Sequence, residues 1–235
     1  KGGRGERENI SCDITLGNMS AATSPAGATP LQAREYQRQA QRCVRLALNA
    51  VNKGSDQWKA ASTSGRSAAS ALVNAILEER DLPNRQLGSF QSVPGIVAAA
   101  LLKLKDAQQG HYTDLCKESA SLRAALEMVR SAADSVQQLL LEHAGAPGNP
   151  THSTSVFHCL PLTTLGNLFG SAVQMMEAEI TVKETVVCGL RDAMSGESDS
   201  QKSQRDRMKP NGCGSLRAVL QTYLATWLLE PELDQ

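Results

Sequence analysis

Aromatic residues make up only 3% of this 235-residue chain, so it lacks the stacking platforms with which proteins bind single-stranded nucleic acid. An excess of either charge is also missing. The 24 lysines and arginines balance 24 aspartates and glutamates, so no global field attracts nucleic acid or an anionic membrane surface. The longest apolar runs, such as residues 95–102, are far too short to span a bilayer. We therefore expect no direct nucleic-acid binding and no membrane insertion.

The six cysteines form no C-x-x-C pair and are too scattered for a small disulfide-stabilised scaffold. Their distribution favours reduced thiols in an intracellular protein. No signal-peptide pattern opens the chain. It begins at Lys1 rather than at a methionine, so a preceding targeting segment remains an open alternative.

Sequence patterns of catalytic and cofactor-binding sites are missing as well. The chain contains no G-x-x-x-x-G-K-[ST] loop, no G-x-S-x-G elbow and no H-E-x-x-H pair. Its four histidines lack the spacing of a zinc site, and two of them, His111 and His143, fall on an apolar helical stripe. We expect a protein that is not an enzyme, with no catalytic residue, no cofactor and no metal.

The chain does contain three long stretches, residues 30–80, 94–144 and 162–194, in which apolar positions recur at alternating steps of three and four. This spacing averages about 3.5 residues per turn, the period of left-handed coiled-coil packing. Each stripe is called a seam below, and a fourth, shorter one follows. In chain order the predicted seams are Val44, Leu48, Val51, Ser55, Trp58, Ser62, Gly65, Ala69, Leu72 and Ile76; then Val97, Leu101, Leu104, Gln108, His111, Leu115, Glu118, Leu122, Ala125, Val129, Ala132, Val136 and Leu139; then Leu165, Phe169, Ala172, Met176, Ile180, Lys183, Val187, Leu190 and Met194; then Leu216, Leu220, Tyr223 and Trp227.

The seams predict an all-α fold, a long antiparallel coiled-coil helical hairpin with two further helices packed on it. Residues 81–94 hold two prolines and a glycine and would return the chain between the first two helices. The last helix would span Ser215–Leu229 and stop before Pro231. The expected organisation is a flexible tail at 1–28, the hairpin at 29–144, a loop at 145–161, and C-terminal helices at 162–231 with a disordered insert at 195–214.

The first seam is poorly filled, because Ser55, Ser62, Gly65 and Ala69 supply little apolar volume. Its phase nevertheless persists across the glycines, so we expect one continuous or gently kinked helix. Small side chains leave room for a further helix, supplied either by the later part of this chain or by a partner. In the third stretch, Glu177, Glu179 and Glu184 lie largely outside the seam and are interpreted as a solvated face.

Two aromatic segments stand out in this aromatic-poor chain. One contains Phe157, His158 and Pro161 just before the third helix, and the other contains Tyr223 and Trp227 in the last helix. The simplest interpretation is packing of the short last helix on the bundle. Together with Trp58, these six residues are the predicted partner-binding or packing positions.

These segments resemble the cyclin-dependent kinase 2-interacting protein family, in which a long coiled coil precedes a Phe-His-x-x-Pro segment and a terminal Tyr-Leu-x-x-Trp-Leu helix followed by proline. The resemblance is most specific over residues 156–231. Over residues 31–144 it depends on the order and length of the helices and on the placement of Trp58. The polar insert at 195–214 and the alanine-rich hairpin depart from the family pattern. The matching positions are Phe157, His158, Pro161, Thr163, Thr164, Tyr223, Leu224, Trp227, Leu228 and Pro231.

The resemblance implies a non-enzymatic adaptor in the nucleus, with a cytoplasmic pool left open. It implies binding to cyclin-dependent kinase 2, to the Cdc7 kinase and to the DNA-damage checkpoint kinase complex. It also implies membership of a AAA+ ATPase assembly, together with a second small helical subunit, that acts on replisome and pre-ribosomal particles.

Two alternatives belong to other classes. A cytoplasmic coiled-coil tethering or cytoskeletal subunit would have the same seams. An amphipathic lipid-binding bundle is a further alternative, and the balanced charge and missing basic faces count against it.

Overall fold

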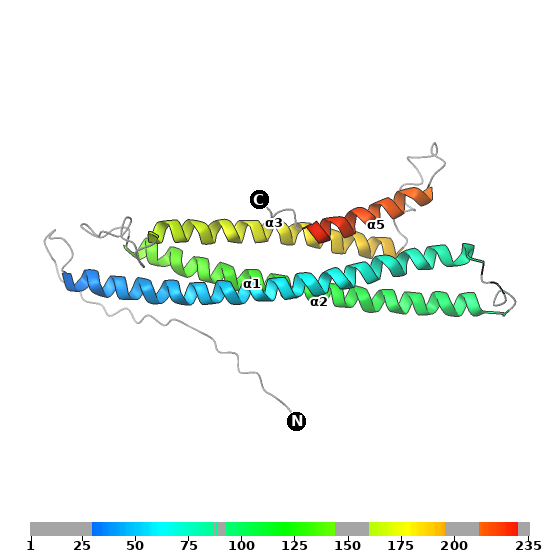
Figure 1. Ribbon diagram of the computed structural model, residues 1–235, viewed down its shortest axis with the longest axis horizontal. Helices are drawn as coiled ribbons and strands as arrows, with labels where there is room; N and C mark the ends of the chain where they lie inside the picture. Colours follow the sequence, from blue (N-terminus) through cyan, green and yellow to red (C-terminus); the bar gives the residue numbers. More distant parts are fainter. Residues whose placement is uncertain (1–29, 87, 89–92, 144–159, 196–211, 230–235) are drawn as a thin grey trace, which may run out of the picture.

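The computed structural model describes residues 30–86, 88, 93–143, 160–195 and 212–229, and within these ranges the chain is almost entirely helical and contains no strand. The helices are α1 (Pro30–Asp81), the short 3-10 helix η1 (Leu82–Asn84), α2 (Ile96–His143), α3 (Leu162–Ser195) and α5 (Gly212–Leu229). Figure 1 shows α1 and α2 side by side as a long hairpin, with α3 and α5 packed along it. The predicted all-α hairpin with two further helices is confirmed. The tail predicted at 1–28, and most of the loop and the insert, lie outside the described residues.

Helix α1 runs unbroken through Gly54 and Gly65, as its constant seam phase predicted. Its 52 residues make a rod about 78 Å long at 1.5 Å per residue. Helix α2 begins two residues later than predicted, at Ile96, because Gly95 has a φ of +79°, outside the range of a right-handed helix. Helix α5 begins at Gly212, three residues before the predicted start. Its first turn carries no apolar repeat, so periodicity alone missed it.

The core of the hairpin follows the predicted seams closely, with one correction on α1. Leu48 is 40% exposed, and Ala47 is buried in its place at 3%. The buried positions here include Val44, Ala47 and Gly54, which belong to a second set spaced three and four residues apart. The larger side chain of Leu48 favoured the other set in the sequence. The helices approach so closely here that a Cβ on Gly54 would lie 2.8 Å from Cγ2 of Val129. Small residues therefore mark contact between helix backbones.

This close approach gives the first prediction. Gly54→Ala should lower the free energy of unfolding by about 1–3 kcal/mol, because the new methyl group also meets the carbonyl oxygen of Ala125, at 3.1 Å. Gly110→Ala on α2 is the matched control, because nothing lies within 4 Å of its added Cβ. That variant should be more stable by about 1 kcal/mol, the intrinsic helix preference for alanine. Urea denaturation followed by far-UV circular dichroism measures both, and equal effects in the two variants would contradict the close packing.

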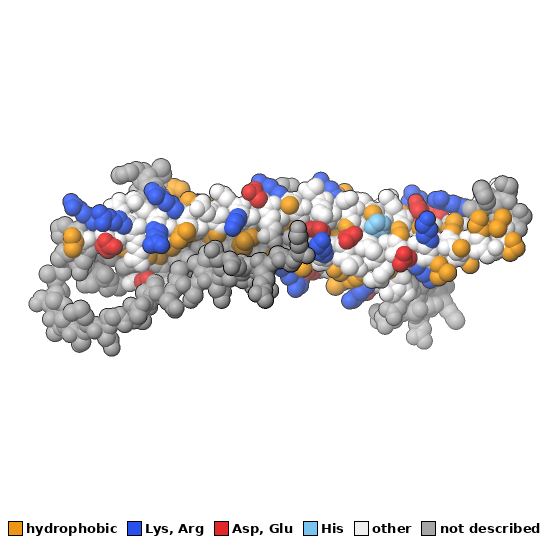
Figure 2. Space-filling model, turned by 90° about the horizontal axis from the view of Figure 1, so that it is seen from below, with side chains coloured by type: hydrophobic (Ala, Val, Ile, Leu, Met, Phe, Trp, Pro, Cys, Tyr) orange, Lys and Arg blue, Asp and Glu red, His pale blue; other side chains and the backbone are white. Residues whose placement is uncertain are grey.

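Helices α3 and α5 cover only part of the hairpin. The end formed by residues 77–86 and 93–104, called the hairpin tip below, extends beyond both of them (Figure 1). Hydrophobic side chains gather at this end of the molecule, at the right of Figure 2. Among the described helices, only α1, the short η1 and α2 reach the tip, so its side chains have fewer neighbours than those in the middle of the rod.

Candidate partner-binding surfaces

The room left by small seam residues on α1 is filled by α5. Trp227 is 1% exposed, and a Cβ on Gly65 would lie 2.7 Å from Cζ2 of its indole ring. Tyr223 fits against Gly189 of α3 in the same manner, 2.5 Å from a Cβ built there. Of the two occupants left open by the sequence, the chain's own last helix is the one observed. The glycines are needed because only a missing side chain admits these rings.

Two cations hold the carboxyl end of α5. Lys183 on α3 donates a hydrogen bond from Nζ to the Trp227 carbonyl at 3.2 Å, and Nζ lies 4.7 Å from the centroid of the Trp227 ring. Arg66 on α1 donates to the Leu228 carbonyl at 3.5 Å. Carbonyls at a helix carboxyl end lack intrahelical partners and carry partial negative charge, so both contacts are favourable.

Lys183 in turn forms an ion pair with Glu179, at 3.0 Å between Nζ and Oε1, and the two side chains are 1% and 0% exposed. The interpretation of Glu179 as part of a solvated face is therefore wrong. Glu179 lies one turn before Lys183, whose Nζ bonds the Trp227 carbonyl, so the buried pair belongs to the junction between α3 and α5. The apolar periodicity of one helix does not reveal which of its other side chains a second helix will bury. A buried pair of this kind is held in place because each charge needs the other.

The six predicted positions fall into three groups. Trp58, Tyr223 and Trp227 join one apolar core, where Trp58 is 5% exposed and Tyr223 is half-buried. Pro161 lies apart, at the start of α3, where its carbonyl accepts the Leu165 N–H at 3.2 Å. Phe157 and His158 lie outside the described residues. In this conformation Trp58, Tyr223 and Trp227 pack the bundle and are not surface contacts for a partner.

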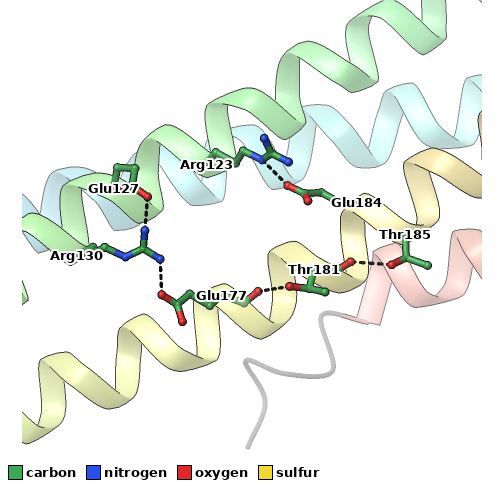
Figure 3. A network of polar contacts seen from close by, with 7 residues as sticks. All are labelled: Arg123, Glu127, Arg130, Glu177, Thr181, Glu184 and Thr185. Carbon is green, nitrogen blue, oxygen red and sulfur yellow. Dashed lines mark hydrogen bonds and ion pairs between the residues drawn. The ribbon is translucent and has the colours of Figure 1, made fainter.

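Ion pairs between α2 and α3 close the long side of the bundle (Figure 3). Arg123 bonds Glu184, and Arg130 bonds both Glu177 and Glu127. The hydrogen bond that Arg123 donates to Glu184 is the main reason why the pKa of Arg123 lies above its usual value. These pairs are partly exposed to solvent, so they fix the register of α3 against α2 and contribute little stability.

Beside these pairs lies a shallow open groove lined by Cys116, Arg123, Glu184 and Cys188. The pKa of the neighbouring Tyr112 is raised mainly by burial and, to a smaller extent, by a hydrogen bond with Cys116. No group of three or more metal-ligating side chains is found in the described part of the chain. The groove is too open to enclose a small ligand, so it is not the candidate site.

The hairpin tip is a more informative surface. Ile96 to Leu102 is apolar on every side of the helix, and such a helix is normally buried. Here Val93 is 48% and Leu102 is 70% exposed. Ala98 and Ala99 are exposed as well. A contiguous apolar surface of this kind on a folded protein marks an interaction site.

A second surface, which the sequence analysis missed, is a row of cations on the solvent side of α1. The exposed side chains of this row are called the basic stripe below, and they are Arg34, Arg38, Arg42, Arg45 and Lys53. Figure 2 shows Lys and Arg side chains gathered toward the left end, where α1 begins. The balanced total charge concealed it. Counting charge along the α1 sequence alone would have revealed it.

No family model matches the sequence, and neither a curated protein nor a solved structure matches it. No helix in the described ranges is long and apolar enough to cross a membrane.

Proposed function

We propose that this chain is a non-enzymatic adaptor that binds other proteins by helix packing, and that the hairpin tip is a docking surface. The observation that supports this proposal is the exposed apolar tip, with Val93 and Leu102 open to solvent where the hairpin extends beyond α3 and α5. Further along the rod α3 and α5 pack on the hairpin, whereas at the tip neither of them covers the apolar side chains.

The docking mode follows from the geometry of the tip. Two antiparallel helices form a groove between them, and an amphipathic helix from a partner can lie in that groove with its apolar face down. Leu101 and Leu104 are half-buried there, so a third helix would complete their burial. At the tip, the partner helix would thus be the third helix of the packing, as α3 is further along the hairpin.

The motif resemblance supplies candidate partners for this mode. They are cyclin-dependent kinase 2, the Cdc7 kinase, the checkpoint kinase complex, and a AAA+ ATPase assembly with its second small helical subunit. In this proposal the chain links these proteins to replisome or pre-ribosomal clients in the nucleus. The alternative function is a cytoplasmic coiled-coil tether, which would use the same tip to bind motor or vesicle proteins.

The test compares Leu102→Ser with Leu141→Ser, which changes a leucine of similar exposure, 67%, at the other end of α2. Burying one leucine contributes about 1.5–3 kcal/mol, so Leu102→Ser should reduce partner recovery about tenfold or more. The matched control should leave recovery unchanged. The measurement is affinity capture by the whole chain from nuclear and cytoplasmic extracts, with immunodetection of the named kinases and the ATPase.

Recovery of these proteins by the wild-type chain and not by Leu102→Ser supports the proposal. Recovery of motor or vesicle proteins instead supports the tether. Equal recovery by both leucine variants would show that the tip is not the docking surface.

A further inference from the structure

The basic stripe runs along the first half of α1. Its members are spaced four, four, three and eight residues apart, which places them on one side of the helix, opposite the buried Val44 and Ala47. From Arg34 to Lys53 the stripe extends about 28 Å, at 1.5 Å per residue. It is long enough to contact five turns of a partner helix.

The charge of this region is not balanced locally. Residues 30–59 hold six cations and two anions, Glu35 and Asp56, for a net charge of +4 in a chain whose total is zero. The half of α2 that packs beside it, residues 127–143, holds three anions and one cation, and residues 162–176 of α3 carry no charged side chain, so a local net charge of +2 remains. The positive potential therefore extends into solvent on this side of the rod.

Apart from Arg45, the members of the stripe are weakly paired within the protein. Arg38 lies 3.9 Å from Glu35, and both side chains are about three-quarters exposed. No described residue forms a hydrogen bond or ion pair with the side chains of Arg34, Arg42 or Lys53. Arginines without a carboxylate partner present their planar donor groups to an incoming anion.

Exposed leucines accompany the cations. Leu46 is 57% and Leu48 is 40% exposed, and on a helix of 3.6 residues per turn they lie on opposite edges of the stripe. Leu31, at the amino end, is 78% exposed. The surface therefore offers a cationic centre with apolar edges.

This arrangement distinguishes between possible anionic partners. A helix that lies on a membrane has its apolar side chains in the centre and its cations at the edges, the reverse of the order here. A nucleic-acid backbone would pair with the arginines and leave the leucines uncovered. An acidic helix with leucines beside its carboxylates matches both parts of the surface.

We propose that the basic stripe of α1 docks an acidic amphipathic helix of another protein, whose carboxylates pair with Arg38 and Arg42 and whose apolar side chains cover Leu46 and Leu48. This surface is separate from the hairpin tip, and it would give the chain a second docking face near the opposite end of the rod.

The test uses a synthetic helical peptide with glutamates at the spacing of the stripe and leucines beside them. A peptide of the same composition in scrambled order is the control. Binding to the full chain is measured by fluorescence anisotropy at two salt concentrations. The patterned peptide should bind and the scrambled one should bind at least about tenfold more weakly, with both affinities falling as salt rises.

Paired variants locate the binding. Arg38→Glu with Arg42→Glu should weaken the patterned peptide about tenfold or more, because both charges are reversed at the centre of the stripe. The matched control, Lys117→Glu with Arg217→Glu, reverses two exposed cations on α2 and α5 and should leave peptide binding unchanged. Leu102→Ser at the tip should also leave peptide binding intact, so a failure of the tip proposal and a failure of this one are distinguishable.

Three results would overturn the proposal. One is a Kd for the patterned peptide weaker than about 1 mM, which corresponds to no useful docking. The second is equal binding of both peptides, which would show charge attraction without a docking face. The third is that duplex DNA or phosphatidylserine vesicles bind more tightly than the peptide, and that this binding is abolished in the same double arginine variant.

Discussion

Lys183→Ala should lower the free energy of unfolding by about 3–5 kcal/mol, because it leaves the Glu179 carboxylate buried without its cation. It also removes the Nζ donor from the Trp227 carbonyl and the cation above the indole ring. All three losses fall at the junction of α3 and α5. Urea denaturation of the whole chain measures the effect.

The double variant Glu179→Leu with Lys183→Met is the control for this prediction. It replaces both charges with apolar side chains of similar size, and such replacements are commonly neutral or stabilising. Most of the stability lost in Lys183→Ala should therefore return. If Lys183→Ala alone costs less than about 1 kcal/mol, the pair is not buried in solution as the structure has it.

Trp227→Ala should cost about 3–5 kcal/mol, the range for removing a large aromatic side chain from a core. Because Trp227 lies on the last helix, its removal should loosen α5 while the α1–α2 hairpin stays folded. Hydrogen exchange monitored by mass spectrometry should become faster than in the wild-type chain over residues 216–229 and should change less over residues 96–143. Uniformly faster exchange in both regions would contradict a local effect.

Gly65→Ala tests the same contact from the other side. In the wild-type chain the added methyl group meets the Trp227 ring and should destabilise the protein, as overpacked residues do. In the Trp227→Ala background the space is empty, so the same change should be stabilising by about 1 kcal/mol, because alanine is the better helix former. This change of sign is a coupling between two residues 162 positions apart. Identical effects in both backgrounds would show that the two residues do not touch.

The helices themselves were predictable from the sequence because each long seam repeats with one constant phase. Even the unbroken course of α1 through Gly54 and Gly65 followed from that phase. The error at Leu48 has a simple physical origin. Two seams, one through Ala47 and one through Leu48, both satisfy the three-four spacing, and side-chain volume favoured the wrong one. Contact between backbones, which selects alanine and glycine, is a property of two helices together.

The partner-binding surfaces were harder to predict than the helices. Seam analysis identifies what is buried, so it found Trp58 and Trp227 and assigned them to partner binding or to packing without deciding between the two. Burial now places both in the core. The exposed surfaces depend on where α3 and α5 stop covering the hairpin. Those end points depend on the lengths of the helices and on how far each is shifted along the hairpin. The burial of Glu179 depends on the same offsets.

The order of synthesis has a consequence for the space above Gly65. Gly65 and Trp227, whose ring fills this space, are 162 residues apart in the chain. At roughly 5–20 residues per second, a ribosome needs about 8–30 s to add that many residues. During this interval the newly made α1 displays an open apolar notch, and any chaperone or companion subunit that meets the nascent chain can occupy the notch before Trp227 exists.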